Sequence, residues 1–196
     1  MSAKILSNEK KCKYFTGTFA MSAPKLYRHY DSLANNIRSH YPELCLPHAD
    51  SVFMATTINL GDKVVTRRHR DEKNLANGLC GVVSLGNYDY KHGGHLVLHE
   101  PKIILEFPPN WVIFLPSACI EHSNIGISDK EWRSSITYYT AGGLFRWVAY
   151  GYQCEGDVDP EQLQRIQEAG DTRWNEGIDL LSKVGNLKKD IISTFS

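Results

Sequence analysis

The chain has 196 residues, with 22 Lys and Arg balanced by 22 Asp and Glu, and 42% of its residues are hydrophobic. This balance is typical of an ordinary globular protein and does not favour a dedicated nucleic-acid-binding domain, which is usually basic overall. The longest apolar runs reach about five residues, far below the ~20 that a membrane span needs, and the five cysteines are scattered without a CxxC pair.

These features predict an intracellular protein, nuclear or cytoplasmic, with no membrane partner. The length suits one core, and neither an internal repeat nor a linker interrupts the chain. We therefore expect a single domain over residues 1–196, and a monomer.

The N-terminal part of the chain predicts one helix. Residues 1–20 are polar and Lys-rich, which favours a loose arm or an edge strand. After Pro24, apolar residues recur at intervals of four, three and four, the pattern of one helical face; they are Leu26, Tyr30, Leu33 and Ile37. The helix is expected to end before Pro42, which gives a helical flank over about residues 22–41.

From Ser51 to Tyr150, short runs rich in Val, Ile, Thr and Tyr alternate with turn signals. The predicted strands are 52–60, 80–85, 94–99, 102–107, 111–115, 119–123, 133–140 and 145–150. Short strands with close turns are typical of a sandwich, barrel or jelly roll rather than of βαβ units. We therefore predict a mainly β fold, with its core over about residues 51–150.

Helices are predicted again after Gly151. Asp159 is a candidate N-cap, with Pro160 in the first turn, Gln162 at the capping-box position and Gly170 as a stop. A last helix is predicted from four apolar residues at the same spacing of four, three and four: Leu180, Val184, Leu187 and Ile191. This second helical flank, over about residues 159–195, is expected to pack on the outside of the β core.

The pair His69 and Asp71 is the first candidate for chemistry. In extended backbone, residues two apart point to the same side, so an imidazole and a carboxylate project together. His122, in a later predicted strand, adds a second imidazole. Two His and one carboxylate on one face of a metal form the facial triad of Fe(II) oxygenases. The basic residues around this pair could meet an anionic substrate; they are Arg67, Arg68, Arg70 and Lys73.

Arg133 and Ser135 predict an anchor for a carboxylate. A guanidinium offers a fixed fork that binds a carboxylate through two hydrogen bonds. Ser135 lies two residues later on the same face of the predicted strand, so its hydroxyl can donate to the same group. Such an anchor is expected for the far carboxylate of a dicarboxylic co-substrate such as 2-oxoglutarate.

The ordered set His69-x-Asp71, His122 and Arg133-x-Ser135 resembles that of the 2-oxoglutarate/Fe(II)-dependent dioxygenases, over about residues 67–150. Residues 69–74 and 133–139 are similar to two motifs of the TET/JBP branch of that superfamily, and residues 141–147 are similar to the corresponding run of its small fungal members. The resemblance implies a double-stranded β-helix (jelly-roll) core that uses Fe(II), O2 and 2-oxoglutarate, with ascorbate as reductant.

The resemblance also implies roles for single residues. His69, Asp71 and His122 would be the iron ligands, and Arg133 and Ser135 would bind the distal carboxylate of 2-oxoglutarate. Its other predicted contacts are His95 to the co-substrate, Asn74 to a flipped base, and Tyr139, whose ring would stack on that base. Where cytosine-acting members place a His that hydrogen-bonds the pyrimidine, this chain has Ala141.

The function implied is that of an enzyme, a dioxygenase that oxidises the methyl group of a nucleobase in nucleic acid, DNA rather than RNA. The candidate bases are 5-methylcytosine, thymine and N6-methyladenine, and oxidation of 5-methylcytosine would serve DNA demethylation. Small size, zero net charge and Ala141 favour an alternative, a 2-oxoglutarate-dependent hydroxylase of a small molecule, free nucleobase or peptide. A third class, a jelly-roll binding protein without turnover, is disfavoured by the complete set of candidate residues.

Other conspicuous residues are expected to be structural. His92 and His99 are assigned to turns and the surface, and Cys80 and Cys119 to small buried positions. Tyr138 and Tyr139 are expected to face opposite sides of one strand. The remaining aromatic residues are assigned to the core rather than to a stacking platform: Trp111, Phe114, Trp132, Phe145 and Trp147.

Overall fold

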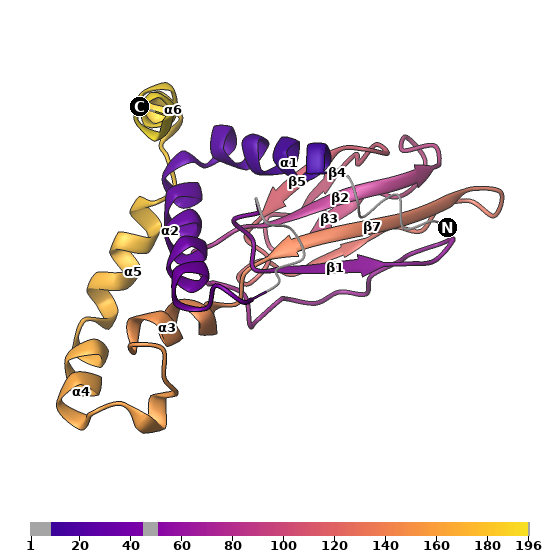
Figure 1. Ribbon diagram of the computed structural model, residues 1–196. Coiled ribbons are helices and arrows are strands. Elements are labelled where there is room, and N and C mark those ends of the chain that lie inside the picture. The colour runs from indigo at the N-terminus through magenta and orange to yellow at the C-terminus, as the bar shows by residue number, and fades with distance from the viewer. Residues whose placement is uncertain (1–8, 45–50, 196) are drawn as a thin grey trace. The chain divides into compact units, whose positions relative to one another are not determined.

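The computed structural model describes residues 9–44 and 51–195 (Figure 1). Within these residues the chain forms two compact units. The β unit comprises Ala55–Gly143, and the helical unit comprises the described residues up to Met54 and from Leu144 onward. Neither unit contains a helix that is long and apolar enough to cross a membrane, as far as the described residues show.

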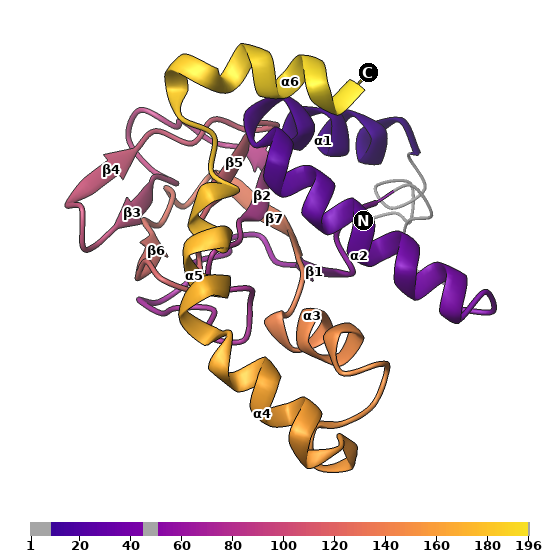
Figure 2. The same cartoon turned by 90° about the vertical axis from the view of Figure 1, so that its left-hand side faces the viewer.

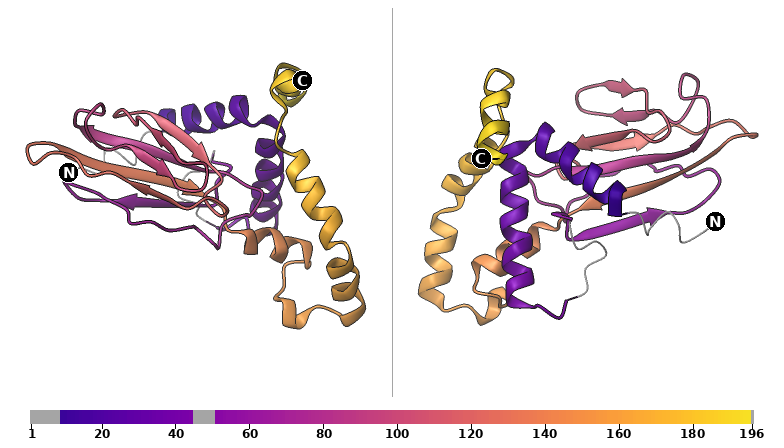
Figure 3. Two further views of the ribbon diagram at one scale, coloured as in Figure 1. Left: turned by 180° about the vertical axis from the view of Figure 1, so that it is seen from behind. Right: turned by 45° about the horizontal axis from the view of Figure 1, so that its top comes forward.

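Two antiparallel sheets make up the β unit (Figures 1 and 3). The first has the order β1-β7-β2-β5, with β1 at Ala55–Asn59, β7 at Trp132–Tyr139, β2 at Cys80–Asn87 and β5 at Val112–Leu115. The second has the order β4-β3-β6, with β4 at Ile103–Leu105, β3 at Leu96–Leu98 and β6 at His122–Asn124. Seven of the eight predicted strands are thus confirmed in position.

The central strand β7 shows why these residues form a sheet. Its side chains alternate between two faces, as strand geometry requires. Ser134, Ile136 and Tyr138 are buried on one face, and Arg133, Ser135, Thr137 and Tyr139 line a cavity on the other. The expectation that Tyr138 and Tyr139 face opposite sides is therefore confirmed.

The core of the β unit forms part of the wall of that cavity. Cys80, Leu96, Phe107 and Leu115 are each at most 5% exposed, and they join residues of both sheets with the loop after β4. Burial of a Leu or Phe side chain stabilises a fold by about 1.5–3 kcal/mol. The two sheets are thereby held together at one end of the cavity.

The helical unit is organised around α2, which spans Pro24–His40 as predicted (Figure 2). Helix α1 (Glu9–Ser22) and helix α6 (Leu187–Phe195) both contact it. The other helices are α3 (Gly142–Ala149), α4 (Pro160–Glu168) and α5 (Gly170–Asp179), with short 3-10 turns η2 (Glu155–Asp157) and η3 (Val184–Asn186). Buried rings of Phe19, Tyr30 and Phe53 pack with centroids 4.9–5.5 Å apart. The predicted cap of α4 is confirmed, because Asp159 accepts hydrogen bonds from the backbone of Glu161 and Gln162.

The predicted β-rich core with helical flanks agrees with the structure, in which antiparallel sheets are flanked by helices. Helices hold 38% of the described residues and strands 22%. The expected loose arm or edge strand lies partly outside the described residues, but over Glu9–Ser22 it is wrong, because this segment is helical. Phe15 and Phe19, one helical turn apart, are buried with Ala20 and give the segment an apolar face.

Two further element predictions are wrong. The predicted strand 145–150 lies in α3, where the ring of Phe145 stacks on His29 at 4.7 Å and that of Trp147 on Tyr41 at 5.5 Å. These long-range contacts overrode the β propensity of the segment. The predicted last helix begins at Leu187 rather than Leu180, and Val184 is 91% exposed in η3.

Three single-residue assignments also differ. Trp111 is 62% exposed and Cys119 is exposed, so neither is a core residue. Trp111 follows Asn110, whose positive φ of 67° marks a tight turn before β5. Gly170 begins α5 as well as following α4. Cys80 is buried as expected, and His92 is exposed as expected.

Candidate active site

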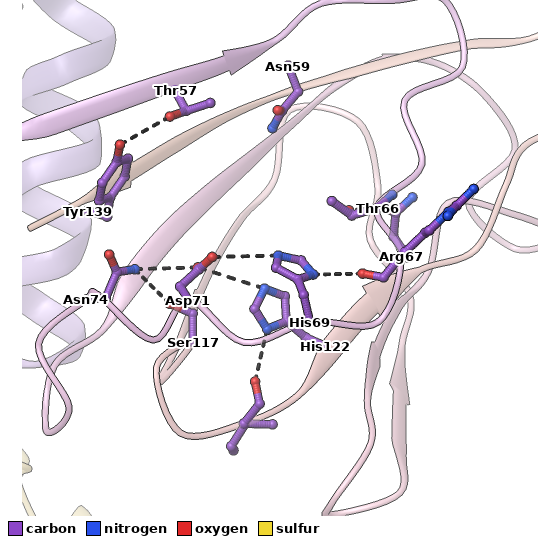
Figure 4. A network of polar contacts seen from close by, with 12 residues as sticks. Thr57, Asn59, Thr66, Arg67, His69, Asp71, Asn74, Ser117, His122 and Tyr139 are labelled. Atoms are coloured by element: carbon purple, nitrogen blue, oxygen red, sulfur yellow. Dashed lines mark hydrogen bonds and ion pairs between the residues drawn. The ribbon is translucent and has the colours of Figure 1, made fainter. Parts of the chain in front are cut away.

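A pair of main-chain hydrogen bonds brings His69 beside His122. The amide of His69 donates to the carbonyl of His122 at 3.1 Å, and the amide of His122 donates back at 2.9 Å. The two rings lie with centroids 4.3 Å apart (Figure 4). Asp71, two residues further on, is fixed by a 2.9 Å hydrogen bond from its amide to the carbonyl of Ser117.

The side chains of these three residues converge. Asp71 Oδ1 lies 3.6 Å from His69 Nε2, and Asp71 Oδ2 lies 4.0 Å from His122 Nε2. One ligand atom from each residue falls within 4.8 Å of the others, and among the described residues no other group of His, Cys, Asp or Glu meets this test. The spacing fits a single ion bound by two imidazoles and a carboxylate.

Both imidazoles are oriented for metal binding. The Nδ1 of His69 lies 2.7 Å from the carbonyl of Arg67, and that of His122 lies 3.0 Å from the carbonyl of Ile120. Each carbonyl fixes the proton on Nδ1, so the lone pair of Nε2 is free to coordinate. Burial lowers the pKa of His122, and the neighbouring His69 lowers it further, which favours the neutral, ligating form.

The triad opens into a cavity of about 510 Å³ between the two sheets. From the first sheet, β1, β2 and β7 contribute Thr57, Asn59, Cys80, Val82, Arg133, Ser135, Thr137 and Tyr139; from the second, β3 and β6 contribute Leu96, His122 and Asn124. Burial raises the pKa of the Cys80 thiol to about 12, so this group stays protonated at neutral pH. A volume of this size is in the range of small-molecule sites.

Arg133 is the unusual group in this cavity. It is only 3% exposed, and its Nη1 donates to the carbonyl of Val64 at 3.0 Å. Its Nε is buried without a hydrogen-bond partner, and no carboxylate among the described residues forms an ion pair with it. Because a buried cation is costly unless it is paired, a guanidinium in this position could bind an anion that enters the cavity.

Ser135 lines the same cavity as Arg133. The side-chain amide of Asn59, from the neighbouring strand β1, donates to Ser135 Oγ at 3.1 Å. Ser135 therefore uses its oxygen as an acceptor within the protein, and its O–H remains free to donate into the cavity. Asn59 was not predicted as a site residue. It lies two residues after Thr57 on the same face of β1, and both side chains line the cavity.

The other predicted site residues are placed unequally. Asn74 lines the cavity, and its side-chain amide lies 3.0 Å from Ser117 Oγ and 3.4 Å from Asp71 Oδ2. Tyr139 also lines it, and its hydroxyl accepts a 3.4 Å hydrogen bond from Thr57 (Figure 4). His95 is half-buried outside the cavity lining, and its Nδ1 is buried without a hydrogen-bond partner among the described residues.

Two of the four basic residues near the triad are neutralised. Arg68 forms an ion pair with Glu121, and Arg70 forms one with Glu100, whose pKa is lowered by the hydrogen bond from Arg70. Arg67 and Lys73 have no ion-pair partner within the described part of the chain. The free positive charge near the cavity is thus smaller than the sequence indicates.

Two polar residues behind the triad were missed by sequence reasoning. Ser117, which is 1% exposed, contacts both Asp71 and Asn74. Asn124 is 7% exposed; its side chain accepts a hydrogen bond from the amide of Thr66 and donates one to the carbonyl of Val64, which also accepts from Arg133. Asn124 lies two residues after His122 in one strand, a spacing that could have indicated a shared face; no local signal marks Ser117.

Comparison with solved structures finds a likeness to NgTET1 in complex with 5mC DNA, with a TM-score of 0.56 and 17% sequence identity. The match covers 71% of this chain and 52% of that one, so this chain corresponds to about half of the NgTET1 chain. No protein-family model matches the sequence. No curated protein matches it either. At this identity the likeness shows that the two proteins share a TET-like fold, and nothing more.

Proposed function

We propose that this protein is an Fe(II)/2-oxoglutarate-dependent dioxygenase. The observation that carries the proposal is the buried guanidinium of Arg133, unpaired within the described residues, in the same cavity as His69, Asp71 and His122. Three ligands on one face of a metal leave positions open for a co-substrate and O2. A dicarboxylate that bound the metal at one end would find the guanidinium of Arg133 for its other end.

Each of these groups has a defined task in the proposed reaction. His69, Asp71 and His122 would hold the metal, while Arg133 and the free O–H of Ser135 would bind the distal carboxylate of 2-oxoglutarate. Fe(II), when bound there, would supply the activation of O2 that oxidises a C–H bond while 2-oxoglutarate is decarboxylated to succinate, with ascorbate as reductant. The chain's own contribution is to position both substrates and to limit the access of water.

We also propose that the β unit has a jelly-roll architecture. Two antiparallel sheets enclose the cavity of the β unit, an arrangement that is compatible with a double-stranded β-helix, or jelly roll. The likeness to NgTET1 supports this assignment. The metal ligands would then come from the start of β6 and the segment after β1, and the carboxylate anchor from β7.

For the substrate, we favour a methyl-bearing nucleobase in nucleic acid, DNA rather than RNA. NgTET1 is in complex with 5mC DNA, and its fold resembles that of this chain. The ring of Tyr139 lines the cavity and offers a surface on which a flipped base could stack. Arg67 and Lys73 are the cations near the triad that remain available for phosphates.

The neutralised arginines favour a second candidate function. Because Arg68 and Arg70 form ion pairs with Glu121 and Glu100, the described residues leave little free positive charge near the triad. A hydroxylase of a small molecule, a free nucleobase or a peptide needs no phosphate contacts. The cavity of about 510 Å³ is large enough for 2-oxoglutarate and a compact second substrate.

One experiment tests both candidates. The protein is incubated with Fe(II), ascorbate and 2-oxoglutarate, and with oligonucleotides that carry 5-methylcytosine, thymine or N6-methyladenine. Succinate is counted, and the digested nucleosides are analysed by mass spectrometry. We expect an oxidised base in proportion to succinate. Succinate without an oxidised base would select the second candidate, and the absence of succinate under all conditions would refute the dioxygenase.

A further inference from the structure

Among the described residues, no main-chain hydrogen bond orients the carboxylate of Asp71, whereas main-chain carbonyls orient the rings of His69 and His122. The side chain of Asp71 is 32% exposed, against 37% for that of His69 and 9% for that of His122. The last torsion of an Asp side chain is soft, so the carboxylate can turn either oxygen toward the histidines. Oδ1 lies 3.6 Å from His69 Nε2, whereas Oδ2 lies 4.0 Å from His122 Nε2 and 3.4 Å from the side-chain amide of Asn74.

A hydrogen-bonded bracket made of Asn74 and Ser117 holds this orientation (Figure 4). The side-chain amide of Asn74 lies between two acceptors, Asp71 Oδ2 at 3.4 Å and Ser117 Oγ at 3.0 Å. The backbone of Asn74 is itself fixed, because its amide donates to the carbonyl of Asp71 at 2.8 Å and the residue pairs with Ala141. The amide group therefore has little freedom to follow a rotating carboxylate.

Ser117 is the rigid end of the bracket. It is 1% exposed, its amide donates to the carbonyl of Leu115, and its carbonyl accepts the amide of Asp71. Its side chain also lies in hydrogen-bonding contact with the buried Cys80. Ser117 is thus linked to Asp71 in two ways: directly, by the main-chain hydrogen bond, and indirectly, through the side-chain amide of Asn74.

We infer that Ser117 and Asn74 are positioning residues for the candidate metal centre, and that they act by fixing the carboxylate of Asp71 so that Oδ1 faces the ligand nitrogen of His69. The inference rests on the proposed function, since it needs a metal at this triad. It gives Asn74 a role different from the base contact that the sequence resemblance implies. It also gives a positioning role to Ser117, which no sequence motif marks.

The physical consequence is an effect on metal affinity. Without the bracket, the carboxylate samples orientations that do not coordinate, and binding must select the competent one. Loss of a partner that orients a ligand typically weakens metal binding by about 10- to 100-fold. We expect an effect in this range for Ser117→Ala and for Asn74→Ala. The double variant should bind the metal no more weakly than the single variant with the lower affinity, because Ser117 and Asn74 act as one unit.

The test measures the dissociation constant of Co(II), a spectroscopic probe for Fe(II), from its visible absorption in the full-length protein under anaerobic conditions. The matched control is Ser84→Ala, because Ser84 is 0% exposed and hydrogen-bonds Tyr88 away from the cavity lining. We expect Ser84→Ala to lower thermal stability without changing the dissociation constant of Co(II). Ser117→Thr, which keeps the hydroxyl, should restore most of the affinity and the wild-type spectrum.

The outcomes separate the inference from the proposed function. Wild-type affinity and spectrum in Ser117→Ala would overturn the inference and leave the metal centre standing. An Asn74→Ala variant that loses oligonucleotide binding with an unchanged Co(II) constant would overturn it too, since Asn74 would then serve only the substrate. A wild-type protein that binds no Co(II) at all would refute the proposed metal centre itself.

Discussion

His69 and His122 each have one ring nitrogen directed at a main-chain carbonyl and the other directed at Asp71. This arrangement sets the tautomer before any metal arrives, so the ligand lone pairs are already oriented. At the scale of single residues, the site is therefore built by backbone carbonyls as much as by the ligands themselves. The same holds for Asp71, whose amide is fixed on Ser117.

The first prediction concerns the three candidate ligands. In His69→Ala or Asp71→Ala, succinate formation should fall below detection, because two ligands do not hold the metal. Mn(II) at 100 times its dissociation constant should stabilise the wild-type protein by about 2.7 kcal/mol and should not stabilise these variants. Differential scanning calorimetry measures this effect. His92→Ala is the control, since His92 is exposed and pairs with Asp89; normal turnover in Asp71→Ala would remove the iron assignment.

Arg133 leads to a second prediction, in which stability and function diverge. Arg133→Met loses one hydrogen bond to Val64, worth about 1 kcal/mol, but it also removes a buried unpaired charge. The free energy of unfolding without ligands should therefore change little, as measured by urea denaturation. The apparent KM for 2-oxoglutarate should rise steeply, and 2-oxoglutarate should no longer raise the melting temperature. An unchanged KM would exclude Arg133 from the co-substrate site.

At the scale of elements, strand β7 determines the composition of the cavity. It pairs with β1 on one side and with β2 on the other, so its register fixes which side chains meet. Asn59 stands opposite Ser135, and Thr57 stands opposite Thr137. Because strand geometry alternates with a period of two, a shift of one residue would turn Arg133 and Ser135 out of the cavity.

Adjacent serines of β7 supply the third prediction. Ser135→Ala should raise the apparent KM for 2-oxoglutarate by about 10- to 100-fold, the effect of losing one hydrogen bond to a charged group. Ser134→Ala is the matched control, because Ser134 is equally buried on the opposite face. It should alter stability and leave this KM unchanged. Steady-state kinetics with varied 2-oxoglutarate distinguish the two, and equal effects would contradict the alternation derived for β7.

At the scale of the whole molecule, electrostatics decides between the candidate substrates. The chain has no net charge, and ion pairs with Glu121 and Glu100 occupy two of the arginines near the triad. A nucleic acid bound at this site would therefore meet few free cations. Arg67 and Lys73 are the residues near the triad from which phosphate contacts are expected.

A fourth prediction follows for the salt dependence of oligonucleotide binding. Each phosphate contact contributes about 1 to the slope of log affinity against log salt concentration, so Arg67→Ala or Lys73→Ala should reduce that slope by about 1. Arg68→Ala should change it less, and Glu121→Gln, which frees Arg68, should increase it. Fluorescence anisotropy at several salt concentrations measures the slope. Affinity independent of salt would favour the small-molecule alternative.

The sequence by itself determined what depends on local pattern. The strands up to 139, helix α2 and the Asp159 cap were predictable, because period, propensity and capping act within a few residues. The residues that converge as a possible metal centre were also predictable as residue types, since His69 and Asp71 share a local spacing. The likeness of this chain to a TET-like fold agrees with the resemblance that these motifs indicated.

Tertiary structure decided what depends on contacts between distant segments. Helix α3 forms where a strand was predicted, because Phe145 and Trp147 stack on His29 and Tyr41. Two features arise from segments far apart in the chain: the bracket of Ser117 and Asn74, and the lack of an ion-pair partner for Arg133 among the described residues. No local pattern encodes such pairings, because burial and hydrogen-bond partners exist only after the sheets have paired.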